Sequence, residues 1–82
     1  MLAKVFITLK KSVQDPQGSA VKHSLESMNF DAVESVRIGK MIEVTLKDNI
    51  EQSVAESQLK EMCDKLLANP VIEDYRYEFT KP

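Results

Sequence analysis

The chain has 82 residues, of which 43% are hydrophobic and 29% are charged, and its formal net charge is −2 at pH 7. A chain of this length forms one domain, and this mixed composition excludes an intrinsically disordered protein. Its lysine and arginine residues are scattered, so the basic patch that a nucleic-acid-binding domain needs is missing. We therefore expect a single domain over residues 1–82 that binds no nucleic acid.

The cysteine content and the hydropathy of the chain further restrict the class of protein and its cellular compartment. Cys63 is the only cysteine, which excludes an intramolecular disulfide and a cysteine-based zinc site and is typical of a reducing compartment. The apolar runs are far shorter than the roughly 20 residues that cross a bilayer. Met1 to Lys4 is expected to open a strand rather than a signal peptide. These features indicate a cytoplasmic protein with no membrane partner, and the small core favours a homo-oligomer.

The first predicted element is a strand. Val5, Ile7 and Leu9 alternate with polar residues, which is the period of a strand that is buried on one face. Phe6 interrupts the polar side of this strand. It is either a solvated single aromatic or part of a surface that a second copy covers.

A helix is predicted next, from about Pro16 to Met28. Asp15 can cap its first turn, and proline is tolerated at the first helical position. Asn29 tolerates the left-handed conformation that ends a helix, with Phe30 folding back. The apolar stripe of this helix consists of Val21, Leu25 and Met28.

Two strands joined by a tight hairpin are predicted around Gly39. The apolar residues on both sides of this glycine occupy even positions: Val36, Ile38, Ile42, Val44 and Leu46. A two-residue loop at Gly39-Lys40 would turn the second apolar set to the opposite face of the sheet. We therefore expect a three-residue connection or a bulge at Gly39.

A second helix and a last strand complete the predicted order. Asn49 and Gln52 have the spacing of a capping box, and apolar residues then follow at helical spacing: Ala55, Leu59, Met62, Cys63, Leu66 and Leu67. Asn69-Pro70 ends this helix, because proline cannot continue its hydrogen-bond ladder. Val71 to Phe79 is the last strand, with aromatic residues on one face and charged residues on the other.

The order β-α-β-β-α-β predicts an α+β fold of the ferredoxin-like type. In this arrangement a four-stranded antiparallel sheet carries two helices on one face. The other face stays open, and it must be polar enough for water or be buried by a partner.

No constellation of catalytic, cofactor-binding or metal-ligating residues emerges. His23 is the single histidine and projects away from the apolar stripe of its helix, and Cys63 lies within an apolar stripe. The acidic pairs Glu61/Asp64 and Glu73/Asp74 are predicted on solvated faces, where general acid or base chemistry is not favoured. The two glycines cannot form a phosphate-binding loop. We predict no catalytic residue, no cofactor site and no metal site in this chain.

Surface residues remain as candidates for contact with partners. Arg37 and Lys40 flank the predicted hairpin, where they either meet an acidic partner or a phosphate or are solvated. The interface candidates are Phe6, Arg37, Gly39, Lys40, Met41, Tyr75 and Arg76. An acylphosphatase-type enzyme would need an arginine and a glycine-rich loop beside the first strand, and an RNA-recognition module would need aromatics on its central strands. An interaction or regulatory module needs neither.

Three stretches resemble the PurS family, the small subunit of phosphoribosylformylglycinamidine synthase. They are Asp15-Pro16-Gln17-Gly18, the segment from Val36 to Lys40, and above all the segment from Glu61 to Tyr75. The resemblance covers nearly the whole chain, with departures at residues 49–58 and 79–82.

The resemblance implies a subunit of a glutamine-dependent, ATP-consuming C–N ligase in purine biosynthesis. A glutaminase subunit releases ammonia, and an ATP-binding synthetase subunit installs it as an amidine, so the complex uses ATP, Mg²⁺ and glutamine. The small subunit implied here carries no active site. It forms a homodimer or homotetramer and bridges the other two subunits so that ammonia passes between them. The alternative is a homo-oligomeric regulatory module of ferredoxin-like fold that binds a small molecule.

Overall fold

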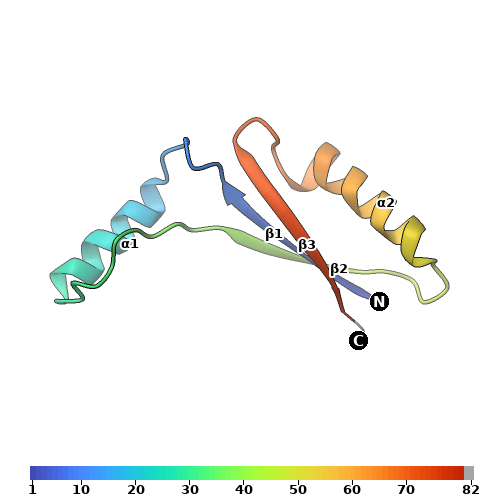
Figure 1. Cartoon of the computed structure of the whole chain (residues 1–82), viewed down its shortest axis with the longest axis horizontal. Coiled ribbons are helices and arrows are strands. Elements are labelled where there is room, and N and C mark those ends of the chain that lie inside the picture. Colours follow the sequence, from blue (N-terminus) through green and yellow to red (C-terminus); the bar gives the residue numbers. More distant parts are fainter. Residues whose placement is uncertain (81–82) are drawn as a thin grey trace.

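A three-stranded antiparallel sheet with the strand order β2-β1-β3 forms the centre of the computed structural model, which describes residues 1–80 (Figure 1). The strands are β1 (Leu2–Leu9), β2 (Lys40–Thr45) and β3 (Glu73–Thr80). The helices are α1 (Pro16–Ser27) and α2 (Gln52–Met62), and a π-helical turn, η1 (Cys63–Leu67), continues α2. The chain is therefore an α+β protein.

The core lies between β1 and the helix α2 with its continuation η1. Val5 and Ile7 of β1 and Leu59 and Cys63 of the helical segment are each at most 1% exposed. Half-buried residues of the outer strands border this cluster: Ile42, Val44, Tyr75, Tyr77 and Phe79. The odd-numbered residues of β1 therefore face the core, as their alternation with polar residues predicts.

The hairpin predicted at Gly39 is wrong for the described residues, and so is the fourth strand within one chain. Residues 33–39 belong to no strand and run directly into β2 (Figure 1). Gly39 forms no reversal and has no positive φ. A glycine is needed there because a Cβ would lie 2.5 Å from the carbonyl oxygen of Ile7, closer than real contacts allow.

The ends of α1 agree with the sequence pattern. The Oδ1 atom of Asp15 accepts a hydrogen bond from the N–H of Gly18 at 3.0 Å, which satisfies a free donor of the first turn. Asn29 has a φ of 68°, and the N–H of Phe30 donates to the carbonyl of Leu25 at 3.0 Å. These two features form the left-handed C-terminal cap that was predicted.

The second helix differs from its prediction at both ends. Its N-cap is Glu51, which makes no side-chain capping bond, so the capping box at Asn49 is wrong. At the other end η1 widens the helix, and Leu66 turns outward with 81% of its surface exposed. The helical segment ends before Asn69-Pro70, as predicted. No helix within residues 1–80 is long and apolar enough to span a bilayer.

Helix α1 and the segment that returns beside it stand away from the sheet. We call residues 16–38 the arm. Figure 1 shows the arm on one side of the sheet and α2 on the other, and no residue of α1 belongs to the described core cluster. The radius of gyration is 16.3 Å, whereas a compact domain of this length has one of about 12 Å.

The two halves of the arm are joined at their base. Besides capping α1, Asp15 accepts a hydrogen bond at Oδ2 from the N–H of Ile38 at 2.7 Å. The guanidinium of Arg37 donates to the carbonyls of Lys10 and Val13, both at 2.8 Å. Gly18 packs against the returning segment so closely that a Cβ would lie 2.2 Å from the carbonyl oxygen of Val36. The arm is therefore one unit rather than two separate loops.

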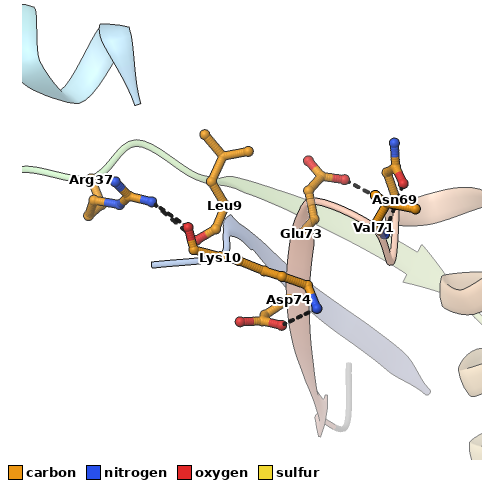
Figure 2. A network of polar contacts seen from close by, with 7 residues as sticks. All are labelled: Leu9, Lys10, Arg37, Asn69, Val71, Glu73 and Asp74. Carbon is orange, nitrogen blue, oxygen red and sulfur yellow. Dashed lines mark hydrogen bonds and ion pairs between the residues drawn. The ribbon is translucent and has the colours of Figure 1, made fainter. Parts of the chain in front are cut away.

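A second set of polar contacts connects the base of the arm to the start of β3. Figure 2 shows Lys10 between Arg37 and Asp74, with the Lys10 ammonium 3.8 Å from the Asp74 carboxylate. The N–H of Lys10 donates to the carbonyl of Ile72 at 2.9 Å. Glu73 accepts a hydrogen bond from the N–H of Asn69 at 2.7 Å, which fixes the turn that leads into β3.

The close contact at Gly18 predicts that Gly18→Ala destabilises the protein. In a helix this change is usually favourable by up to about 1 kcal/mol. Here the methyl group collides with backbone, and we expect a loss of about 1–3 kcal/mol, measured by urea unfolding at fixed protein concentration. Ser19→Ala, at the exposed next position, is the control and should stay within about 0.5 kcal/mol. A stabilised Gly18→Ala variant would contradict the packing described.

The carboxylate of Asp15 predicts a pH-dependent contribution to stability. Hydrogen bonds from the N–H groups of Ile38 and Gly18 lower the pKa of Asp15 below its ordinary value of 3.8. A lowered pKa in the folded state gives stability that is present above pH 3.8 and is lost as the pH falls through the folded-state value. Asp15→Asn should therefore unfold at a lower temperature than the wild type at neutral pH.

On acidification the difference in melting temperature between wild type and Asp15→Asn should shrink. Asp31→Asn, which removes the same charge from an exposed turn, is the matched control and should leave the melting temperature nearly unchanged throughout. A difference for Asp15→Asn that is the same at every pH would show that its ionisation does not matter.

Candidate functional site

An open apolar groove lies beside α2 on the covered face of the sheet. Its volume is about 450 Å³, and it is lined by Val44, Gln58, Glu61, Met62, Lys65, Leu66 and Leu67. Helix α2 covers β1 but leaves the neighbouring inner face of β2 only half-buried. The groove is therefore the part of the sheet that would lie beneath a second helix.

The arm carries the complementary feature, an apolar surface with no sheet beneath it. Val21 is 38% exposed, Met28 63% and Phe30 51%. Apolar residues exposed together in this way are typical of a surface that another element or chain covers. Both helices are amphipathic, but only α2 buries its apolar stripe within the described chain.

The outer edge of β2 is free within residues 1–80. Leu46 donates its N–H to Met1, and Val44 and Ile42 are paired with residues of β1 in the same register. Because hydrogen-bonding direction alternates along a strand, the even-numbered residues of β2 face β1. Met41, Glu43 and Thr45 therefore direct their N–H and C=O groups outward, where another strand can pair with them.

The face of the sheet opposite the helices is largely polar. Phe6 and Arg76 lie together on it, with the guanidinium carbon 4.1 Å from the ring centroid. Arg76 also pairs with Glu78 at 2.8 Å. Met41 is the register partner of Phe6 and lies on the same face. Charged residues surround these few apolar groups, so this face tolerates water.

The remaining sequence-predicted candidates are found in three different environments. Arg37 is exposed and donates hydrogen bonds to backbone carbonyls, whereas Gly39 and Lys40 line a hollow with Phe6 and Met41. Tyr75 lies on the core side, where its hydroxyl donates to Asp64 at 2.8 Å. That hydrogen bond, together with burial, raises the pKa of Tyr75 to about 12. The candidates thus do not form one site.

The cysteine and the histidine of the chain lie on different elements, Cys63 in η1 and His23 in α1. Cys63 is fully buried in the core, and burial raises the pKa of its thiol. His23 is exposed on α1. Within residues 1–80 no three histidine, cysteine or acidic side chains lie close enough to hold a metal ion. The geometry of the described part of the chain favours contact with other proteins over catalysis.

Sequence reasoning missed the groove and the outward position of Leu66. A helical stripe with 3.6 residues per turn places Leu66 and Leu67 together near the core, but the wider turn of η1 separates them. No signal in the sequence marks this widening, because adjacent apolar residues such as Met62 and Cys63 can both pack against a core. The double role of Asp15 was also missed, because its second partner, Ile38, lies 23 residues away in the sequence.

The family comparison agrees with a protein whose surfaces serve assembly. The family model for PurS, phosphoribosylformylglycinamidine (FGAM) synthase, matches residues 2–81. The phosphoribosylformylglycinamidine synthase subunit PurS of Bacillus subtilis is 56% identical over 75 residues, which is 92% of this chain and 87% of that protein. The corresponding subunit of Synechocystis is 48% identical over 94% of this chain and 76% of its own length.

Solved structures show the same fold. The structure of B. subtilis PurS aligns with a TM-score of 0.81 and 53% identity over 98% of both chains. That of Methanocaldococcus jannaschii PurS gives a TM-score of 0.85 at 37% identity over 99% of this chain and 96% of that one. A chain of the Thermotoga maritima PurLQS structure gives 0.76 at 29% identity over 95% of this chain and 96% of that one. The chain therefore belongs to the PurS family of phosphoribosylformylglycinamidine synthase subunits.

Proposed function

We propose that this chain is the non-catalytic small subunit of phosphoribosylformylglycinamidine synthase in purine biosynthesis. The observation that carries the proposal is the 56% identity with the B. subtilis subunit over 92% of the chain. The complex would use glutamine, ATP and Mg²⁺ on its other subunits, in the cytoplasm. This chain would act through residues 1–82 as a single domain, and the family match over residues 2–81 supports that extent.

The subunit would bridge the glutaminase and the synthetase. A T. maritima assembly named PurLQS contains a chain of this fold, which supports placing the subunit in a three-part complex. Ammonia released at one active site reaches the other at high effective concentration when the two are held together. The molecule measures 51 × 29 × 14 Å, and α1 and α2 lie toward opposite ends of it (Figure 1), far enough apart to contact different neighbours.

We also propose that the subunit is a homo-oligomer, a dimer or a tetramer. A single chain exposes 6227 Å², whereas a compact monomer of this mass exposes about 5,000 Å². The excess of about 1,200 Å² is larger than the roughly 800 Å² that each partner buries in a stable interface. The four-stranded, ferredoxin-like arrangement would then be a property of the oligomer rather than of one chain.

The contact surfaces for the other subunits would include the polar sheet face and the backbone around Gly39. Phe6, Met41 and Arg76 offer an apolar centre with a charged border, which is the composition of many interfaces. Lys40 is exposed beside them. Arg37 would contribute indirectly, through its hydrogen bonds at the base of the arm. Tyr75 would contribute through its hydrogen bond to Asp64.

The bridging role predicts a contrast between two nitrogen donors. Amidine formation by the synthetase and glutaminase subunits is measured with and without this chain, using glutamine or free ammonia. We expect the chain to be required with glutamine and dispensable with ammonia, because only the first reaction needs transfer between active sites. Equal rates with and without the chain, for both donors, would contradict the proposed function.

A further inference from the structure

The turn that leads into β3 exposes a run of apolar residues. Pro70, Val71 and Ile72 are consecutive and all three are exposed, Val71 with 79% of its surface accessible. Single exposed apolar residues are common on protein surfaces. Three in a row in a turn are unfavourable unless they serve a contact, because turns are usually polar. We call residues 70–72 the tip.

Hydrogen bonds hold the backbone of the tip in one conformation. The carbonyl of Asn69 accepts from the N–H groups of Ile72 at 3.1 Å and of Glu73 at 2.7 Å. Figure 2 shows two further bonds in this turn: the N–H of Val71 donates to the Asn69 side chain at 3.1 Å, and the N–H of Asn69 donates to Glu73 at 2.7 Å. Pro70 adds a fixed φ. A surface that is already ordered loses little conformational entropy on binding, which favours affinity.

The tip is also attached to the rest of the molecule on both sides. The N–H of Lys10 donates to the carbonyl of Ile72 at 2.9 Å, which connects the tip to the end of β1. Before the tip, the N–H of Ala68 donates to the carbonyl of Cys63 at 3.0 Å, and Ala68 is buried. The side chain of Val71 is thus exposed on an anchored backbone.

An acidic hollow with a volume of about 360 Å³ lies beside the tip. Pro70 belongs to its lining, together with the carboxylates of Asp64, Glu73 and Asp74 and the ammonium group of Lys10. Negative charge is therefore in excess around an apolar projection. A surface that complements both features has an apolar pocket with a basic border, because charges of opposite sign across an interface speed association and fix its orientation.

We propose that the tip inserts into an apolar pocket, bordered by lysine or arginine side chains, on one of the two larger subunits of the complex. The proposal rests on the function proposed above and specifies one of its contact surfaces. Val71 is the anchor of this contact, and the acidic hollow orients it. A second copy of this chain fits less well, because its lysine and arginine residues are scattered along the sequence.

Substitution of Val71 tests the insertion. The affinity of the chain for each purified larger subunit, and for both together, is measured by titration calorimetry. We expect Val71→Asp to raise the dissociation constant at least about tenfold, because a buried valine side chain accounts for at least that factor. Val71→Ala should cause a smaller rise and serves as the test if circular dichroism shows that Val71→Asp is unfolded. The control is Val54→Asp, the same change at a valine of α2 that is 42% exposed, which should change the dissociation constant less than about twofold.

Substitution of Asp64 tests the basic border. Asp64→Asn removes a charge of the hollow but keeps an oxygen that can accept the hydrogen bond from Tyr75. We expect weaker binding at low salt and a smaller dependence of binding on salt, because long-range attraction between charges is screened by ions. Asp31→Asn, in the exposed turn after α1, is the matched control and should bind like the wild type. Tighter binding by Asp64→Asn would overturn the basic border.

Other outcomes overturn the insertion itself. Equal affinities of the wild type and a folded Val71→Asp variant do so. A change of oligomeric mass in Val71→Asp, measured by light scattering, does so as well, because the tip would then contact a second copy. If Val71→Asp binds normally and the glutamine-dependent rate still requires the chain, the bridging function stands and only this contact fails. A wild-type chain that binds neither larger subunit overturns both.

Discussion

At Gly39 the backbone passes so close to the end of β1 that a Cβ would lie 2.5 Å from the carbonyl oxygen of Ile7. The chain follows a straight path there instead of a hairpin. The position of α1 relative to the sheet depends on this path. Because of this path, residues 33–38 lead away from β2, and α1 lies away from the sheet with them. The inner face of β2 is therefore not covered by a second helix.

The arm keeps its shape because its base is held by groups from distant parts of the sequence. The carboxylate of Asp15 accepts one hydrogen bond from the N–H of Gly18, in the first turn of α1, and one from the N–H of Ile38. Arg37 donates to carbonyls that no strand or helix uses. Charge-assisted hydrogen bonds are stronger than neutral ones, so an arm that makes little contact with the sheet can still be presented in one orientation to a partner.

The ends of α1, which depend on neighbouring residues, were predictable from the sequence, whereas the capping box at Asn49 and the path of the chain at Gly39 were not. Asp15 and Asn29 mark the ends of α1 through bonds within five residues, and both predictions were correct. Whether the chain reverses at Gly39 depends on whether β2 pairs with its own preceding segment or with another strand. The alternation of apolar residues around Gly39 does not distinguish these two cases, because the apolar residues occupy even positions in both.

The candidate surface was predictable only in part for the same reason. Phe6 and Arg76 could be assigned to one face once strand parity was known, and they do lie together. The outward turn of Leu66 depends on a local widening of the helix that no periodicity predicts. The predicted hairpin was wrong, but the parity of the apolar residues behind that prediction is informative. Its parity conflict arises only with a two-residue turn, and it disappears where the chain makes no turn at Gly39.

A subunit that joins other proteins can leave its own core incomplete. With 82 residues the chain buries a modest fraction of its surface, and its fully buried large side chains are confined to β1, α2 and η1. The apolar side chains of the arm and of the groove stay exposed in the single chain, so a partner that covers them would add to the stability of the protein. Folding and assembly would then be coupled. For the proposed bridge between two enzymes, such coupling would favour the assembled complex, in which the two active sites are held close together.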